Sequence, residues 1–307
     1  MPVPLRDARQ EAAQSKAAVL REALPWITRF HGHTVVIKYG GNAMIDDDLK
    51  RSFAADVALL SFVGLRPVVV HGGGPQITDI ADSLGVESRF VAGLRVTDDE
   101  MLDVVRMALL GRVNPEMVGL VQAAGAPAVG VAGTDAGLLH VVPATGPDGE
   151  DLGRVGEVDA VDPSILVDLL DDGFVPVVAT MGRDDDGGDR NVNADSAAGA
   201  IAAALGASKL VYLTDVPGLY LDLGDEGSLL SEVGADELAA MLREGRLHDG
   251  MRPKIASIVT ALSAGVPQAH ILDGRVLHAI LIEIFTDEGI GTMITPDPSA
   301  ATREVSA

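Results

Sequence analysis

Thr34-Val-Val-Ile-Lys-Tyr-Gly-Gly41 is a run of β-branched residues followed by a lysine and, one residue later, two glycines. Such a run predicts a buried strand. Lys38 and the glycine backbone then lie at the end of that strand. Open α/β sheets bind their ligands at this edge, and backbone N–H groups that face a hollow suit a phosphate. A strand that ends in a glycine turn with a solvated lysine explains the stretch equally well, so both interpretations stay open at this point.

A second strand, Val68–His71, runs into Gly72-Gly-Gly74 and a helix that we expect to end at Gly85. Residues Asp46–Gly64 have the pattern of a helix between the two strands. A strand, a helix and a second parallel strand form a right-handed unit, so Lys38–Gly41 and the second glycine stretch should meet at one sheet edge. Tight turns explain either stretch alone, but together the two stretches favour an anion site. Neither is a Walker P-loop, because no Gly-Lys-Ser/Thr follows.

The composition bounds the class of partner. The 307 residues carry a net charge of −22, which argues against general binding of nucleic acid or anionic membranes. A site for an anionic ligand would have to be locally positive on this negative surface, which draws attention to the few lysines of the chain. These are Lys16, Lys38, Lys50, Lys209 and Lys254. The absence of cysteine excludes disulfides, thiolate zinc sites and thiol nucleophiles. We expect a cytoplasmic protein, because no stretch is long enough for a membrane span and the first residues lack the apolar core of a signal peptide.

The first residues predict a helix with a separate role. Asp7–Phe30 carries one apolar stripe, and Pro25 should kink the helix. This helix either packs on its own lobe or is offered to another subunit. We expect the boundary between two lobes near the polar, acidic and glycine-rich stretch Gly182–Arg190. We therefore divide the chain into an oligomerisation helix at 1–30 and lobes at 31–182 and 183–307.

Periodicity and capping predict the remaining elements. Thr97 and Glu100 form a capping box that starts a helix to Gly111, and residues 138–160 alternate like a hairpin. Further helices are expected over 162–172, 195–206, 235–245, from 253 onward and over 276–285, and further strands over 127–132, 174–180, 209–214, 267–272 and near 292.

Six motifs follow one another along the chain: Lys38-Tyr-Gly-Gly-Asn-Ala43, His71-Gly-Gly-Gly-Pro75, Gly93-Leu-Arg-Val-Thr97, Asn191-Val-Asn-Ala-Asp195, Leu213-Thr-Asp-Val-Pro-Gly218 and Asp249-Gly-Met-Arg-Pro-Lys254. In this order the chain resembles the amino-acid kinase family, and within it the members that phosphorylate N-acetyl-L-glutamate, from about residue 10 to 295. The resemblance implies an α/β fold, a three-layer α/β/α sandwich with a mainly parallel central sheet and two lobes. It also implies transfer of the γ-phosphoryl group of ATP, used with Mg²⁺, to the side-chain carboxylate of N-acetyl-L-glutamate, the second step of L-arginine biosynthesis.

The resemblance also implies a role for single residues. Lys38 and Lys254 match the lysines that stabilise the transition state, and Asp195 matches the aspartate that holds them in place. The implied acetylglutamate-binding residues are Gly73, Gly74, Arg95 and Asn191, and the implied nucleotide-binding residues are Gly40, Gly41, Asp215 and Gly218. No metal site made of protein side chains is expected. The chemistry agrees, because a carboxylate with a pKa of about 4.3 is already ionised at neutral pH and needs positioning and cations rather than a base.

A second resemblance concerns regulation. The N-terminal helix is similar to the extension that interlaces dimers into a hexamer in arginine-inhibited members of the family, and Glu283–Thr292 is similar to their arginine-site segment. The arginine contacts that this implies are Lys209, His270, Glu283 and Gly289. The alternative is a helix that only covers its own lobe.

Other functions stay open on the sequence alone. A kinase that acts on acetylaminoadipate, carbamate, aspartate or UMP is the nearest alternative. Gly93–Thr97 favours an acylated amino acid, and an aspartate kinase would normally carry a further regulatory domain. One extra methylene changes binding by only about 1 to 3 kcal/mol, so acetylaminoadipate is not excluded. A non-catalytic protein that senses arginine or nucleotide is the alternative from a different class.

Overall fold

An eight-stranded sheet forms the centre of the computed structural model, which describes residues 5–221, 225–247, 251–286 and 289–296. Among the neighbouring strands described in this sheet, β15 and β16 alone are antiparallel, so the mainly parallel sheet is confirmed. The strands in spatial order are β14 (Glu232–Gly234), β16 (Thr292–Thr295), β15 (Ala269–Asp273), β11 (Lys209–Thr214), β1 (Thr34–Tyr39), β2 (Arg66–His71), β8 (Val175–Ala179) and β5 (Ala128–Ala132).

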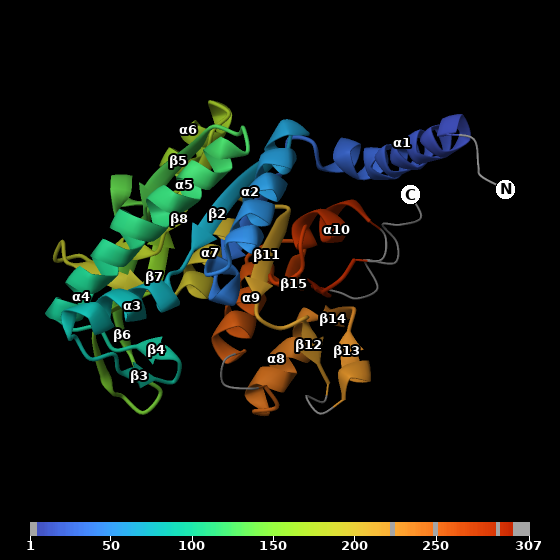
Figure 1. Cartoon of the computed structure of the whole chain (residues 1–307). Helices are drawn as coiled ribbons and strands as arrows, with labels where there is room; N and C mark the ends of the chain where they lie inside the picture. Colours follow the sequence, from blue (N-terminus) through green and yellow to red (C-terminus); the bar gives the residue numbers. More distant parts are fainter. Residues whose placement is uncertain (1–4, 222–224, 248–250, 287–288, 297–307) are drawn as a thin grey trace.

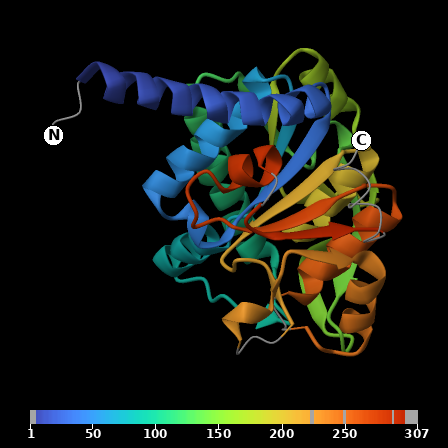
Figure 2. The same ribbon diagram turned by 90° about the vertical axis from the view of Figure 1, so that its right-hand side faces the viewer.

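Helices cover both faces of this sheet (Figures 1 and 2). Val35 and Ile37 of β1 pack among the buried side chains of α2, α5 and α10, whereas Val36 packs among those of α6, α7, α8 and α9. Burial on both faces explains why the strand is a continuous apolar run, and it confirms the three-layer fold. The helices are α1 (Leu5–Phe30), α2 (Asp47–Phe62), α3 (Gly74–Leu84), α4 (Asp99–Arg106), α5 (Asn114–Ala123), α6 (Ser164–Asp171), α7 (Ala194–Ala204), α8 (Ala235–Arg243), α9 (Arg252–Ser263) and α10 (Ala279–Phe285).

Smaller sheets border the central one. The expected hairpin is β6 (Leu139–Thr145) with β7 (Asp151–Val161), and it closes a small barrel with β9 (Met181–Arg183) and β10 (Asp189–Val192). Two short hairpins are β3 (Phe90–Val91) with β4 (Leu94–Arg95), and β12 (Leu219–Tyr220) with β13 (Leu229–Leu230). Short 3-10 turns are Gly41–Met44, Asp135–Gly137 and Glu226–Ser228.

The stretch Gly182–Arg190, near which we predict the boundary between lobes, contains parts of two strands. Its two ends belong to β9 and β10, which pair antiparallel, with Arg183 opposite Asp189. The polar side chains find partners across this pair: Arg183 lies 2.9 Å from Asp189, and Arg190 donates to Asp184 at 2.7 Å. Acidic and glycine-rich composition is typical of loops, and it hid a strand pair whose polar groups satisfy one another.

Three helix boundaries also differ from expectation. The side chain of Asp98, not Thr97, caps α4 by accepting from the Met101 N–H at 2.8 Å. After α4 the chain continues past Gly111 as a π-helix, Met107–Val113. The last helix begins at Ala279 rather than Val276, because His278 before it has a left-handed backbone with φ of 59°.

The helix α1 runs past Pro25 without ending. Its C-terminal part is joined to the body, where Trp26, Ile27 and Phe30 pack with the apolar side chains of α10. Its remaining length projects away from the sheet in Figure 1 and carries the exposed side chains of Val19, Leu20 and Leu24. Across the described ranges, none of the helices combines the length and the apolarity that a membrane span requires.

Candidate active site

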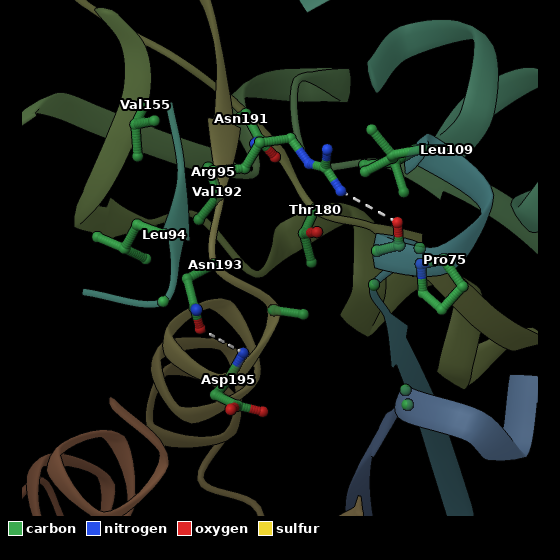
Figure 3. A pocket seen from close by; sticks show the side chains of 18 of the residues that line it. Pro75, Leu94, Arg95, Leu109, Val155, Thr180, Asn191, Val192, Asn193 and Asp195 are labelled. Carbon is green, nitrogen blue, oxygen red and sulfur yellow. Dashed lines mark hydrogen bonds between the residues drawn. The ribbon is translucent and has the colours of Figure 1, made fainter. Parts of the chain in front are cut away.

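A pocket of about 320 Å³ opens at the carboxyl ends of β1 and β2, where both glycine stretches meet as predicted (Figure 3). The two strands pair in parallel, with Tyr39 opposite His71, and this register sets the two stretches side by side. The predicted site residues on its wall are Lys38, Gly40, Gly41, Gly73, Gly74, Arg95, Asn191 and Asp195.

Two ammonium groups meet at one wall of this pocket. Lys254 Nζ donates to Asp195 Oδ2 at 3.0 Å, and Lys38 Nζ lies 3.0 Å from Asp195 Oδ1. The three residues come from α9, α7 and β1, so the cluster exists only in the folded chain. Burial alone would raise the pKa of Asp195, but the two positive charges outweigh it and lower that pKa to about 2. Burial lowers the pKa of Lys254, an effect that the negative charge of Asp195 opposes.

The glycine turn after β1 leaves room for these charges. A Cβ on Gly40 would lie 2.7 Å from Lys38 Nζ, so a side chain there would push the ammonium away from its position. Gly41 has φ of +74°, and a Cβ there would lie 2.6 Å from Asp215 Oδ1. The turn therefore brings the predicted nucleotide residues Gly40, Gly41 and Asp215 together. Gly218 lies elsewhere, against Thr292 of β16, and is not on the pocket wall.

Arg95 forms a second positive position on another side of the pocket (Figure 3). Only 7% of its surface is exposed, and its guanidinium donates to Thr78 Oγ1 at 2.8 Å and to the Gly74 carbonyl at 3.1 Å. It lies 4.6 Å from the centre of the Phe90 ring. Burial lowers the pKa of Arg95, and within the described ranges no carboxylate lies at ion-pair distance from it. A buried cation without a counterion suits an anionic ligand.

Asparagines line the wall between these two positions. Asn191, on β10, donates from Nδ2 to Thr97 Oγ1 at 3.2 Å. Asn193 caps α7 by accepting from the Asp195 N–H at 2.8 Å, which fixes the first turn of the helix that carries the carboxylate (Figure 3). Asparagine is a common capping residue, but the sequence pattern does not separate Asn193, which caps the helix, from Asn191, which bonds to Thr97 and lines the pocket.

The glycine stretch Gly72–Gly74 has a buried support that was not predicted from the sequence. His71 Nδ1 donates to the Gly72 carbonyl at 2.8 Å, and Asn114 Nδ2 donates to His71 Nε2 at 3.0 Å. Burial lowers the pKa of His71 to about 4, so the ring is neutral at pH 7 and carries its proton on Nδ1. Asn114 also donates to the Val177 carbonyl at 2.8 Å, which joins this support to β8. A histidine directly before the glycines was the only sequence signal.

A second cluster lies away from the pocket and contains all four predicted arginine contacts. Lys209 Nζ lies 3.2 Å from His270 Nε2, and His270 Nδ1 lies 2.7 Å from Glu283 Oε1. Gly289 adjoins the Glu283 carboxylate. Burial raises the pKa of Glu283, but the hydrogen bond from His270 helps to bring it below its usual value. The ammonium of Lys209 also lies 4.7 Å from the ring of Phe30, the last residue of α1.

Comparison with sequence families and curated proteins gives close relatives. The sequence profile of the Amino acid kinase family matches residues 33–273. The acetylglutamate kinase of Salinispora tropica is 55% identical over 287 residues, which cover 92% of this chain and 97% of the relative. The acetylglutamate kinase of Acidothermus cellulolyticus is 56% identical over 292 residues, which cover 93% of this chain and 98% of the relative.

Solved structures share the fold. N-acetylglutamate synthase from Neisseria gonorrhoeae, complexed with coenzyme A and N-acetyl-glutamate, superposes with a TM-score of 0.81 at 30% identity. The match covers 92% of this chain and 63% of that one, so this chain spans less than two thirds of the synthase. Carbamate kinase from Giardia lamblia bound to AMP-PNP has a TM-score of 0.65 at 20% identity, with 87% and 99% covered, which shows a common fold alone.

Proposed function

Because the chain belongs to the amino acid kinase family and is an enzyme of the kinase class, we propose that it phosphorylates the side-chain carboxylate of N-acetyl-L-glutamate with ATP. The product is N-acetyl-L-glutamyl 5-phosphate, and the reaction is the second step of L-arginine biosynthesis. The names of the relatives support this substrate. The observation in the structure that carries the proposal is one pocket with two positive positions, Arg95 on one side and the Lys38–Asp195–Lys254 cluster on another.

This arrangement matches a dicarboxylate that must react at one end only. Arg95 donates three of its five guanidinium N–H groups to Ser88, Thr78 and the Gly74 carbonyl, and we assign the α-carboxylate to the two that remain. The side-chain carboxylate then lies at Lys38, beside the glycine stretches. Asp195 neutralises one of the two ammonium charges, so the cluster keeps a net charge of +1 for the reacting anions.

The reaction needs no proton transfer. A carboxylate oxygen forms a bond to the γ-phosphorus as the bond from that phosphorus to the bridging oxygen of ADP breaks, and the electron pair leaves with ADP. Charge spreads over the transferring oxygens in the transition state. Lys38 and Lys254 stabilise this charge, and the N–H groups of Gly40, Gly41, Gly73 and Gly74 offer it uncharged donors.

The nucleotide belongs beside the turn at Gly41, where Asp215 is the adjoining carboxylate. Searched over the described residues, the structure holds no group of three His, Cys, Asp or Glu side chains fit for a metal. Mg²⁺ would therefore be held mainly by phosphate oxygens with Asp215 beside them, and would neutralise phosphate charge. Gly218 remains a predicted nucleotide contact.

An assay of ADP release tests the proposal. ATP and Mg²⁺ are supplied with N-acetyl-L-glutamate, with N-acetyl-L-aminoadipate or with no acceptor. We expect release that depends on N-acetyl-L-glutamate and is weaker with the longer analogue. A preference for the analogue would assign the sibling substrate, and no acceptor-dependent release would favour a non-catalytic sensor.

We further propose arginine feedback inhibition at the cluster of Lys209, His270, Glu283 and Gly289. The support is geometric: the four residues adjoin one another, and Lys209 also contacts α1 through Phe30. The exposed apolar side chains of α1 support a homo-oligomer, a hexamer built from dimers. The cytoplasmic location stays a prediction, as does the division into an acetylglutamate-binding lobe at 31–182 and an ATP-binding lobe at 183–307.

A further inference from the structure

One buried hydroxyl joins two of the residues assigned to the substrate. Thr97 has no exposed surface, and its Oγ1 donates to the Arg95 carbonyl at 2.9 Å. The same oxygen receives the hydrogen bond from Asn191 Nδ2 at 3.2 Å. Arg95 lies on strand β4 and Asn191 on strand β10, which belong to different sheets. The Thr97 hydroxyl forms a hydrogen bond with each of these residues.

The hydroxyl determines which way the Asn191 amide faces. A carbonyl only accepts, so the single Thr97 proton is committed to Arg95. The hydroxyl can then only accept from Asn191, and the amide must turn its Nδ2 toward Thr97. Its Oδ1 is left as an acceptor, and among the residues that the structure describes this oxygen has no hydrogen-bond partner. Asn191 lines the pocket, so a ligand can supply the missing donor.

The chemistry of the proposed substrate limits what that donor can be. Both carboxylates of N-acetyl-L-glutamate are ionised at neutral pH and only accept. The acetamido N–H is its one donor. We propose that Thr97 is a positioning residue that makes Asn191 present its carboxamide oxygen to this N–H, and so selects an acylated amino acid. This inference rests on the proposed function.

The backbone of Thr97 is held independently of its hydroxyl. Its N–H donates to the Leu152 carbonyl at 3.0 Å, and its carbonyl accepts from the Arg154 N–H. Gly153 allows this close approach, since a Cβ there would lie 2.4 Å from the Thr97 carbonyl oxygen. Replacing the hydroxyl by a methyl group should therefore change the orientation of Asn191 and leave the course of the chain intact.

The test compares Thr97→Val with Thr97→Ser on two acceptors, N-acetyl-L-glutamate and 2-acetoxyglutarate, in which an ester oxygen replaces the N–H. Loss of one oriented hydrogen bond should raise the KM for N-acetyl-L-glutamate by about tenfold in Thr97→Val and leave the KM for ATP unchanged. The wild-type preference for the amide over the ester should fall by about the same factor. Thr97→Ser, which keeps the hydroxyl, should have the wild-type KM for N-acetyl-L-glutamate and the wild-type preference for the amide.

A matched control is Thr295→Val, which removes another buried hydroxyl, one whose Oγ1 has no hydrogen-bond partner among the described residues. It should change neither KM nor preference. Equal losses for amide and ester in Thr97→Val, or no loss, would overturn the inference. If Thr97→Val does not fold, Asn191→Ala must reduce the amide preference by the same factor, and a preserved preference overturns the inference. The proposed function fails separately, if the wild-type enzyme itself releases no ADP with N-acetyl-L-glutamate.

Discussion

Lys38 and Lys254 lie on the two oxygens of a single carboxylate, each ammonium nitrogen 3.0 Å from one oxygen of Asp195. Lys38 is on the wall of the pocket, and Lys254, of which 5% is exposed, approaches from α9 behind it. Two like charges this close repel, and Asp195 between them makes their approach possible. The cluster is positive overall before any ligand binds, as a site for two mutually repelling anions requires.

Replacing Lys38 by alanine should affect turnover far more than substrate binding. The ammonium acts on charge that develops in the transition state, so we expect kcat to fall by about 10²- to 10³-fold. Calorimetric titration should show the affinity for N-acetyl-L-glutamate within a few-fold of the wild type. Lys16→Ala, at an exposed position of α1, serves as the control. Equal losses of turnover and affinity in Lys38→Ala would contradict the role.

Replacing Arg95 by glutamine should have the opposite signature. The guanidinium is proposed to bind the non-reacting carboxylate, so the KM for N-acetyl-L-glutamate should rise by about 10²-fold while the KM for ATP stays unchanged. Because no carboxylate of the described residues lies at ion-pair distance from the buried Arg95, its loss should not lower the Tm of the ligand-free protein. Steady-state kinetics give the two KM values. Thermal shift without N-acetyl-L-glutamate gives the Tm of the free protein, and thermal shift with it shows whether the ligand still binds. The control is Arg112→Gln, which removes an exposed arginine that forms a surface ion pair with Asp79. A wild-type ligand shift in Arg95→Gln would exclude the assigned contact.

His71 should make stability fall in mild acid. Burial lowers its pKa in the folded protein to about 4, whereas the unfolded chain has the usual value of about 6.5. Below about pH 6.5 the unfolded chain protonates His71, whereas the folded protein keeps the ring neutral down to about pH 4. The contribution of His71 to the free energy of unfolding is therefore complete above pH 6.5 and declines as the pH falls toward 4. Between about pH 6.5 and pH 5 the wild type should lose about 2 kcal/mol of unfolding free energy through this residue.

Urea unfolding at several pH values measures this loss, with His71→Asn for comparison. Asparagine can still donate to the Gly72 carbonyl but does not titrate. The other groups titrate alike in both proteins, so the difference between the two curves belongs to His71. Parallel curves would show that the folded protein accepts the proton.

Deleting residues 1–28 should reduce the size of the particle and abolish inhibition by arginine. The deletion removes the exposed apolar side chains of α1 and the segment that leads to Phe30, whose ring faces Lys209. Light scattering and assays with added arginine check both effects. His270→Asn separates the two effects, because it should weaken inhibition by arginine without changing the size of the particle. A deleted protein of unchanged size would exclude α1 as the oligomerisation element.

Local pattern predicted much of this molecule. The β-branched run before Lys38 and the glycines after it defined a strand end, and the parallel βαβ unit predicted that Gly72–Gly74 would meet it. Composition did not reveal the strand pair within Gly182–Arg190, where polar groups such as those of Arg183 and Asp189 satisfy one another. The capping-box prediction was wrong because Thr and Asp can both cap a helix. Asp98 accepts from the Met101 N–H, whereas the Thr97 hydroxyl donates to the Arg95 carbonyl.

The sequence by itself determined the periodicity of the elements, the glycines at the strand ends and the few lysines, because these depend on neighbours along the chain. Only the tertiary structure decided that Lys38, Asp195 and Lys254 meet, that no described carboxylate pairs with the buried Arg95, and that Asn191 Nδ2 donates to the Thr97 hydroxyl. Charge pairing and hydrogen-bond direction depend on distances between residues that are far apart in the chain, and packing of the sheet and helices sets those distances.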